Sequence, residues 1–142
     1  MQTIAKRNKV IYWMATGLLS AFMIMNAVMY VIQNDLVSEM FVSLGYPTYL
    51  IYPLGTAKIL GIIAILTRRS KLLKEWAYGG FFFNFLLALT AHLIVGDGGF
   101  VPTLVAIILL LVSRVYDGKV FGSDASTLEP TSTFEAIPQA AR

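Results

Sequence analysis

Residues 10–32 read VIYWMATGLLSAFMIMNAVMYVI and contain no Asp, Glu, Lys, Arg or His. At about 1.5 Å per residue, a helix over this stretch is long enough to cross a hydrocarbon core about 30 Å thick. A secretory signal peptide is the alternative, because basic residues precede the apolar run: Lys6, Arg7 and Lys9. The run is too long for the hydrophobic core of a signal peptide, however, and no A-x-A-like cleavage site follows it. We therefore predict an uncleaved membrane-spanning helix after a basic cytoplasmic segment, 1–9.

Three further apolar segments predict three more spans, over about 49–67, 76–95 and 100–116. The connection 33–48 keeps enough Leu, Val, Met and Phe to form a short interfacial helix, whereas the glycine-rich stretch 96–99 is typical of a tight turn. The expected fold is thus all-α: a membrane four-helix bundle occupying 10–120. The Ser, Thr, Pro and Ala content rises after it, which predicts a disordered cytoplasmic tail over 121–142.

The composition excludes several classes of protein. Hydrophobic residues make up 57% of the chain and charged residues only 13%, which would leave a soluble domain with uncovered apolar surface. The net charge of +3 raises nucleic-acid binding as an alternative, but the basic residues border the apolar segments instead of lining one face, so we expect no nucleic-acid partner. The absence of cysteine excludes thiol chemistry and thiolate-ligated clusters. The first expected partner is the lipid bilayer.

The basic residues are distributed unequally between the two sets of connections. The connections 33–48 and 96–99 contain no Lys or Arg. The other side carries Lys6, Arg7, Lys9, Arg68, Arg69, Lys71, Lys74, Arg114 and Lys119. By the positive-inside rule, this asymmetry predicts that both termini lie in the cytoplasm, and Trp and Tyr residues near the ends of the spans agree with it.

Lys58 is a charged residue placed near the middle of the bilayer by the rise per residue. A lysine there costs about 2.5 to 3.5 kcal/mol on insertion scales, so it needs a partner or a hydrated cavity. Gly55 and Gly61 stand three residues to either side, which predicts close helix packing on that face. Two interpretations stay open. Lys58 binds an anionic or quinone-like head or titrates in a proton step, or it is a structural ammonium that is held by backbone carbonyls or snorkels toward the outer surface.

The third span carries a narrow stripe of small and polar residues. Gly80, Asn84, Ala88 and His92 recur at every fourth position, so we expect them to face the interior of the bundle, with Gly80 and Ala88 in helix packing. His92 suits a proton relay because imidazole titrates near physiological pH. A metal role is not predicted, since no second His or Cys is available to complete a site.

The first span adds Asn26 and, one turn later, Tyr30. We therefore hypothesise a polar centre in the outer half of the bundle, formed by Lys58, Asn84, His92, Asn26 and Tyr30. The alternative is that these residues only make interhelical hydrogen bonds, each worth about 0.6 kcal/mol. Common nucleotide-binding, zinc-protease and serine-hydrolase motifs are absent, so no catalytic residue is predicted and the sequence leans against an enzyme.

Several short motifs resemble those of one membrane-protein family. They are Tyr46-Pro47, the LGTAKILG run at 54–61, the EWAYGGF run at 75–81 and Ala91-His92. Over roughly residues 8–118 the chain resembles the DoxX-like family of bacterial four-helix membrane proteins. The resemblance implies the four-helix architecture, a bacterial inner-membrane location and an accessory role in membrane redox or stress physiology.

We therefore expect a protein without enzymatic activity that binds a small amphiphile or a membrane redox partner subunit at its polar centre, with no resident cofactor. One alternative is a membrane subunit of a quinone-linked oxidoreductase, with a quinone near Lys58 and His92. The other is a small proton-coupled transporter, acting as a homo-oligomer because four short helices enclose little volume.

Overall fold

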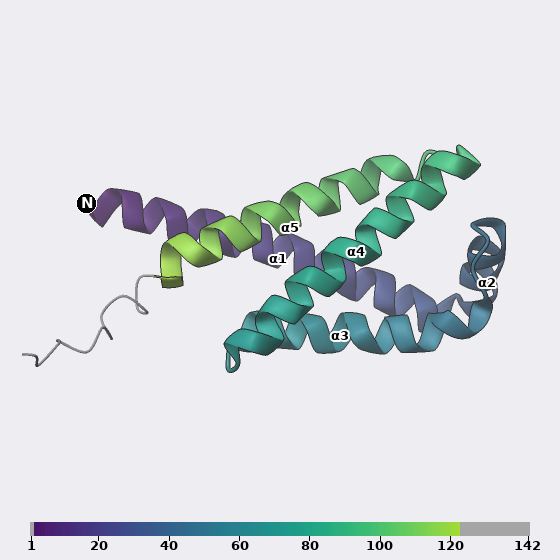
Figure 1. Cartoon of the computed structure of the whole chain (residues 1–142), viewed down its shortest axis with the longest axis horizontal. Helices are drawn as coiled ribbons and strands as arrows, with labels where there is room; N and C mark the ends of the chain where they lie inside the picture. Colours follow the sequence, from purple (N-terminus) through teal and green to yellow (C-terminus); the bar gives the residue numbers. More distant parts are fainter. Residues whose placement is uncertain (1, 123–142) are drawn as a thin grey trace, which may run out of the picture.

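The structure is a computed structural model that describes residues 2–122 of the chain. The described part is helical and contains no strand. Its elements are α1 (Gln2–Ile32), α2 (Asn34–Ser43), the 3-10 turn η1 (Thr48–Leu50), α3 (Ile51–Thr67), α4 (Lys71–Val95) and α5 (Phe100–Phe121). The helices α1, α3, α4 and α5 are long and apolar enough to cross a membrane, when α3 is counted together with η1 as Thr48–Thr67. The predicted all-α, four-helix membrane bundle is confirmed (Figure 1).

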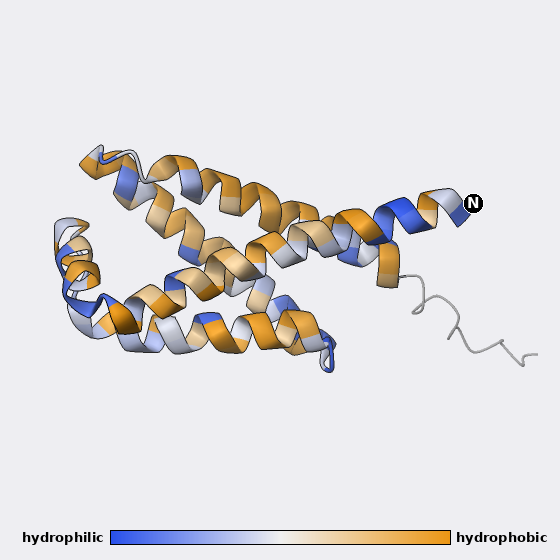
Figure 2. Cartoon of the chain, turned by 180° about the vertical axis from the view of Figure 1, so that it is seen from behind, coloured by the Kyte–Doolittle hydropathy of each residue, from blue (hydrophilic) through white to orange (hydrophobic). Residues whose placement is uncertain are grey.

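The bundle has two chemically different ends. The start of α1, the α3–α4 loop and the end of α5 lie at one end, which we call the basic end, and α2 lies at the opposite end with the α4–α5 turn (Figure 1). Apolar residues cover the long helices between the two ends, while polar residues gather at the start of α1, in α2 and in the loops (Figure 2). Helix α2 occupies the connection where a short helix was expected.

The helix boundaries follow local capping. Arg68 takes the left-handed conformation that ends α3, with φ of 53°, and Ser70 caps α4 by accepting a hydrogen bond from the Leu73 amide at 3.3 Å. The third span, predicted over about 76–95, begins earlier, because Lys71 already starts α4, and the loop before it is limited to 68–70. At the other end of α4, Gly96 ends the helix with φ of 72°, a conformation that favours glycine. Of the predicted tail, 123–142 lies outside the described residues.

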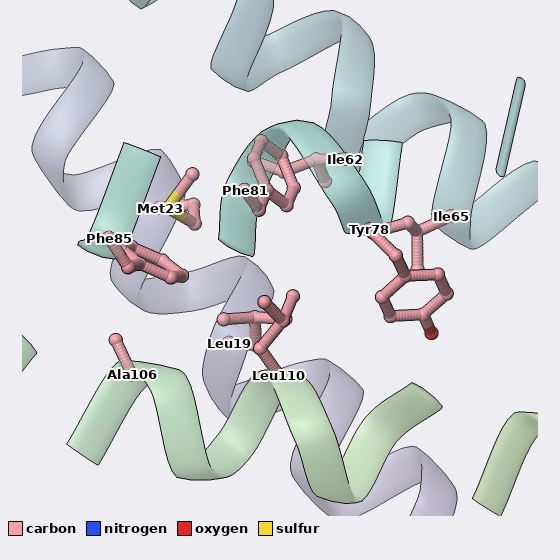
Figure 3. Packing of buried hydrophobic residues seen from close by; sticks show 9 residues of the cluster. All are labelled: Leu19, Met23, Ile62, Ile65, Tyr78, Phe81, Phe85, Ala106 and Leu110. Carbon is pink, nitrogen blue, oxygen red and sulfur yellow. The ribbon is translucent and has the colours of Figure 1, made fainter. Parts of the chain in front are cut away.

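A buried apolar cluster holds the four long helices together midway along the bundle. Figure 3 shows its side chains converging from all four helices: Leu19, Met23, Ile62, Ile65, Tyr78, Phe81, Phe85, Ala106 and Leu110. In a bilayer such packing stabilises by van der Waals contact, since lipid tails offer no hydrophobic gain. Gly61 permits the α3–α4 contact, because a Cβ there would lie 2.5 Å from Cζ of the buried Phe81 ring.

Candidate functional site

A cavity of about 320 Å³ lies between the apolar cluster and the α2 end of the bundle. All five residues of the hypothesised polar centre line it: Asn26 and Tyr30 from α1, Lys58 from α3, and Asn84 and His92 from α4. Apolar side chains form the rest of its wall, including Phe41 of α2 and Met29 of α1. We call this space the polar cavity. That it is a functional site remains a prediction.

Lys58 is only 6% exposed, and its ammonium is held across the α1–α3 interface. Its Nζ donates a hydrogen bond to the Tyr30 hydroxyl at 2.7 Å and lies 4.1 Å from the centroid of the same ring. A cation this close to an aromatic ring is attracted by its π electrons. The close approach of the two helices does not depend on glycine at Gly55, since a Cβ there would lie 3.4 Å from Tyr30 Cδ2, in ordinary contact.

The short helix α2 packs over the Tyr30 side of the polar cavity. The Phe41 ring meets the Tyr30 ring edge to face, with centroids 5.6 Å apart. Phe41 also belongs to a second apolar cluster with Val37 and Ile51, which fastens α2 to the start of α3. The α2 segment therefore positions Tyr30, and through it Lys58, from outside the four-helix bundle.

His92 is oriented by the α4–α5 turn. Its Nδ1 lies 2.8 and 2.9 Å from the two oxygens of Asp97 and donates the hydrogen bond, because a carboxylate can only accept. The Gly99 amide donates to Asp97 Oδ1 at 2.8 Å. Together with this amide bond, the bond from His92 lowers the pKa of Asp97 below its ordinary value. The His92 ring lies so close to Gly99 that a Cβ there would overlap it.

The remaining predicted residues have more varied surroundings. Asn26 donates to the Phe22 carbonyl of its own helix at 2.9 Å, whereas no hydrogen bond joins the Asn84 side chain to another residue within 2–122. Ala88 lines the polar cavity. Gly80, expected to pack against a neighbouring helix, instead has open space where its Cβ would be, and it lines an adjoining groove between α3 and α4.

A second polar group, which the sequence did not indicate, lies in the bundle near the basic end. The Ser113 hydroxyl of α5 bonds to Thr16 Oγ1 of α1 at 2.7 Å and to the Tyr78 hydroxyl of α4 at 2.8 Å, and all three residues are buried. Tyr12, one of the tyrosines near the ends of the predicted spans, is fully buried beside this group. Single hydroxyls carry little signal in an apolar helix, because each can bond to its own backbone.

Charged residues also pair at the basic end, where the sequence indicated only a loop. The buried Asp117 accepts a hydrogen bond from the Lys74 ammonium and lies 3.7 Å from Arg68 Nε. Arg114 Nε donates to Glu75 Oε2 at 2.9 Å. These pairs join the start of α4 to the end of α5, so the positive residues there also stabilise the fold.

The polar cavity offers a ligand hydrogen-bond donors from Lys58, Tyr30 and the Asn84 amide. His92 already donates its Nδ1 proton to Asp97, so its neutral ring presents Nε2 as an acceptor. Within residues 2–122, His, Cys, Asp and Glu form no group of three that could hold a metal ion. No catalytic set of nucleophile, base and orienting acid is assembled around the polar cavity by the residues that line it.

Fold and cavity together define a four-helix membrane protein with a polar centre buried in one half of the bundle. The DoxX-like family profile matches residues 14–114, and the chain belongs to this family. No curated protein and no solved structure matches the chain.

Proposed function

We propose that this chain binds the polar head of a lipid-soluble molecule in the polar cavity, with the Lys58 ammonium as the principal donor. The observation that carries the proposal is the partnering of Lys58. No acidic side chain within residues 2–122 pairs with it, and its one hydrogen-bond partner there is the neutral Tyr30 hydroxyl. An ammonium has three protons to donate, so a ligand oxygen in the cavity would be a favourable further acceptor.

The proposed ligand is an amphiphile whose head carries carbonyl or carboxylate oxygens. A buried charge without a counter-ion is costly, and such oxygens would lower that cost more than an apolar ligand would. The protein would act as a binding or accessory subunit, because the residues that line the cavity suit recognition more than bond making. We further propose that both termini face the cytoplasm, which places the polar cavity in the outer half of the membrane.

A quinone is the second candidate that a specific observation favours. Donors reach the polar cavity from separate helices, the Lys58 ammonium from α3 and the Asn84 side-chain amide from α4. A quinone carries carbonyl oxygens on opposite sides of its ring, which suits donors on different walls. In this version of the proposal, the chain would serve as a quinone-binding subunit of a membrane redox system.

The proton-coupled transporter hypothesis receives less support from the packing. The buried apolar cluster lies between the polar cavity and the polar group around Ser113, as the order of residues along α4 shows: Tyr78, Phe81 and Phe85 precede His92. A transported ion would have to cross this cluster. We therefore favour binding over transport.

The test is native mass spectrometry of the protein released gently from detergent, beside the variants Lys58→Met and Lys119→Met. Lys119 is exposed near the end of α5 and serves as the matched control. A discrete small molecule retained by the wild type and by Lys119→Met, but lost from Lys58→Met, would support the proposal. An empty wild type, or retention unchanged in Lys58→Met, would contradict it.

A further inference from the structure

A groove of about 630 Å³ follows the α3–α4 interface on the outside of the bundle. Its wall is almost entirely apolar and includes Leu60, Ile63, Leu73, Trp76 and Phe81. Trp76 is 71% exposed, so this wall faces the surrounding lipid and not the bundle interior. We call it the α3–α4 groove.

The α3–α4 groove and the polar cavity meet at three residues. Leu54, Lys58 and Asn84 line both, so the buried ammonium stands where the polar space joins the apolar one. The far end of the groove reaches Arg69 and Ser70, at the basic end of the bundle. A polar compartment is thus joined to a long apolar one that opens to the membrane.

We propose that the α3–α4 groove holds the hydrocarbon chain of the amphiphile whose head occupies the polar cavity, which makes the ligand a single-chain amphiphile that enters sideways from the bilayer. This proposal rests on the proposed function. It assigns the ligand a direction: the head lies at Lys58, and the chain runs along α3 toward Thr67.

The dimensions of the groove suit one chain. From Lys58 to Thr67 the rise along α3 is about 14 Å, close to half of a hydrocarbon core of about 30 Å. Small residues line the groove on both helices: Ala57, Gly61 and Ala64 of α3, and Ala77 and Gly80 of α4. At Gly80 a Cβ would meet nothing within 4 Å, so the protein leaves this space open.

An ordinary phospholipid fits the groove less well. Its head would lie at Arg69, and its chain would then end at the Lys58 ammonium, where an apolar methyl group offers the charge no acceptor. In the reverse direction an oxygen-bearing head satisfies the buried Lys58 ammonium, and the chain ends near Arg69, which is exposed and can bond to water. Charge complementarity therefore favours the amphiphile over the phospholipid.

The tryptophans provide a local reporter of the chain. Trp76 lines the α3–α4 groove, and the chain's other tryptophan, Trp13, lies on α1 away from it. In a Trp13→Phe parent, a fatty acid carrying bromine near the end of its chain should quench Trp76 fluorescence when it occupies the groove. The fatty acid supplies the carboxylate oxygens that the proposed head requires.

Adjacent glycines give a matched pair of variants in this parent. Gly80→Leu places its side chain in the groove. Gly79→Leu adds the same side chain at a position where a Cβ also meets nothing, but Gly79 does not line the groove. We expect saturable quenching in the parent and in Gly79→Leu. In Gly80→Leu the affinity should fall at least about tenfold, because several methylene contacts are lost. Circular dichroism checks the folding of each variant, and Gly80→Ala replaces Gly80→Leu if the latter does not fold, with a smaller expected loss of about threefold.

The outcomes separate the two proposals when Lys58→Met is titrated alongside. One outcome is that the Gly80 variant, Gly80→Leu or its substitute Gly80→Ala, keeps the affinity of the parent while Lys58→Met loses binding. It would overturn the groove proposal and leave the head site standing. Loss of binding in the Gly80 variant with no effect of Lys58→Met would show a lipid chain bound independently of the head, which also overturns it. An absence of saturable quenching in the parent would overturn both. Loss of affinity in both variants, with Gly79→Leu unaffected, is the expected result.

Discussion

Lys58 and Tyr30 provide the sharpest test at the scale of single residues. Tyr30→Phe removes the hydroxyl that accepts the 2.7 Å hydrogen bond but keeps the ring that attracts the ammonium. We predict a loss of stability of about 1.5 to 3 kcal/mol, the range for hydrogen bonds to charged groups. A double-mutant cycle with Lys58→Met, measured by thermal unfolding in detergent, should give a coupling energy above the average of about 0.6 kcal/mol for hydrogen bonds between membrane helices. Additive effects of the two variants would mean that the pair is not coupled.

Asp97 carries a pH-dependent prediction. Hydrogen bonds from the Gly99 amide and from His92 lower its pKa in the folded state, so the folded protein binds this proton less readily than the unfolded chain. The resulting stabilisation is present above the ordinary Asp pKa of about 3.9 and is lost as the pH falls through the folded-state value. From about pH 5 to about pH 3, the melting temperature should therefore fall more in the wild type than in Asp97→Asn. Asp35→Asn, an exposed change in α2, is the control and should follow the wild type.

Helix packing is tested at the scale of elements by two glycines that share the α3–α4 interface. Gly61→Ala would bring a Cβ to 2.5 Å from the Phe81 ring, which cannot move freely because it is buried in the apolar cluster. We predict that Gly61→Ala lowers the free energy of unfolding by about 1 to 3 kcal/mol, as in other overpacked cores. Gly80→Ala meets nothing and should be neutral or slightly stabilising, since Ala favours the helix. Equal effects of the two changes on the melting temperature would contradict this account of the interface.

The contact of α1, α4 and α5 near the basic end depends on the Ser113 hydroxyl. Ser113→Ala would leave Thr16 and Tyr78 without the partner they share in a fully buried position. The expected cost is about 1 to 3 kcal/mol, because unsatisfied buried polar groups keep their desolvation penalty. Thr90→Ala, which removes an exposed hydroxyl bonded to its own helix at the Leu86 carbonyl, should change the melting temperature little. A Ser113→Ala protein as stable as Thr90→Ala would show that the three hydroxyls contribute nothing.

The elements also show why only part of the site could be predicted. Lys58 and His92 could be assigned to the bundle interior because a charge or imidazole at membrane depth is too costly to face lipid. The Ser113 group could not, because a serine or threonine in an apolar helix satisfies itself on its own backbone as readily as on a neighbour. Asp117 could not be assigned for a different reason. It occupies a stretch that looks like a membrane boundary, where a charge needs no partner, but it pairs with Lys74 inside the bundle.

At the scale of the whole molecule, the fold could be predicted because length, apolar content and loop composition are local properties of each span. The distribution of polar contacts along the bundle could not, since it depends on how the four helices meet. The structure divides the interior into the polar cavity, the apolar cluster and the Ser113 group, in that order toward the basic end. A cavity closed on one side by packed aromatic rings suits the proposed ligand, which would enter and leave through the membrane.

The orientation in the membrane gives the last prediction. The chain has no cysteine, so single cysteines can be introduced without a background, at Thr3→Cys on the basic end and at Ser43→Cys at the end of α2. Because the Lys and Arg of the loops gather at the basic end, it should remain in the cytoplasm. A membrane-impermeant maleimide added to intact bacteria should label Ser43→Cys at once, and Thr3→Cys only after the membrane is opened. The reverse pattern would place the polar cavity in the inner half of the bilayer, so its ligand would then be drawn from the cytoplasmic leaflet.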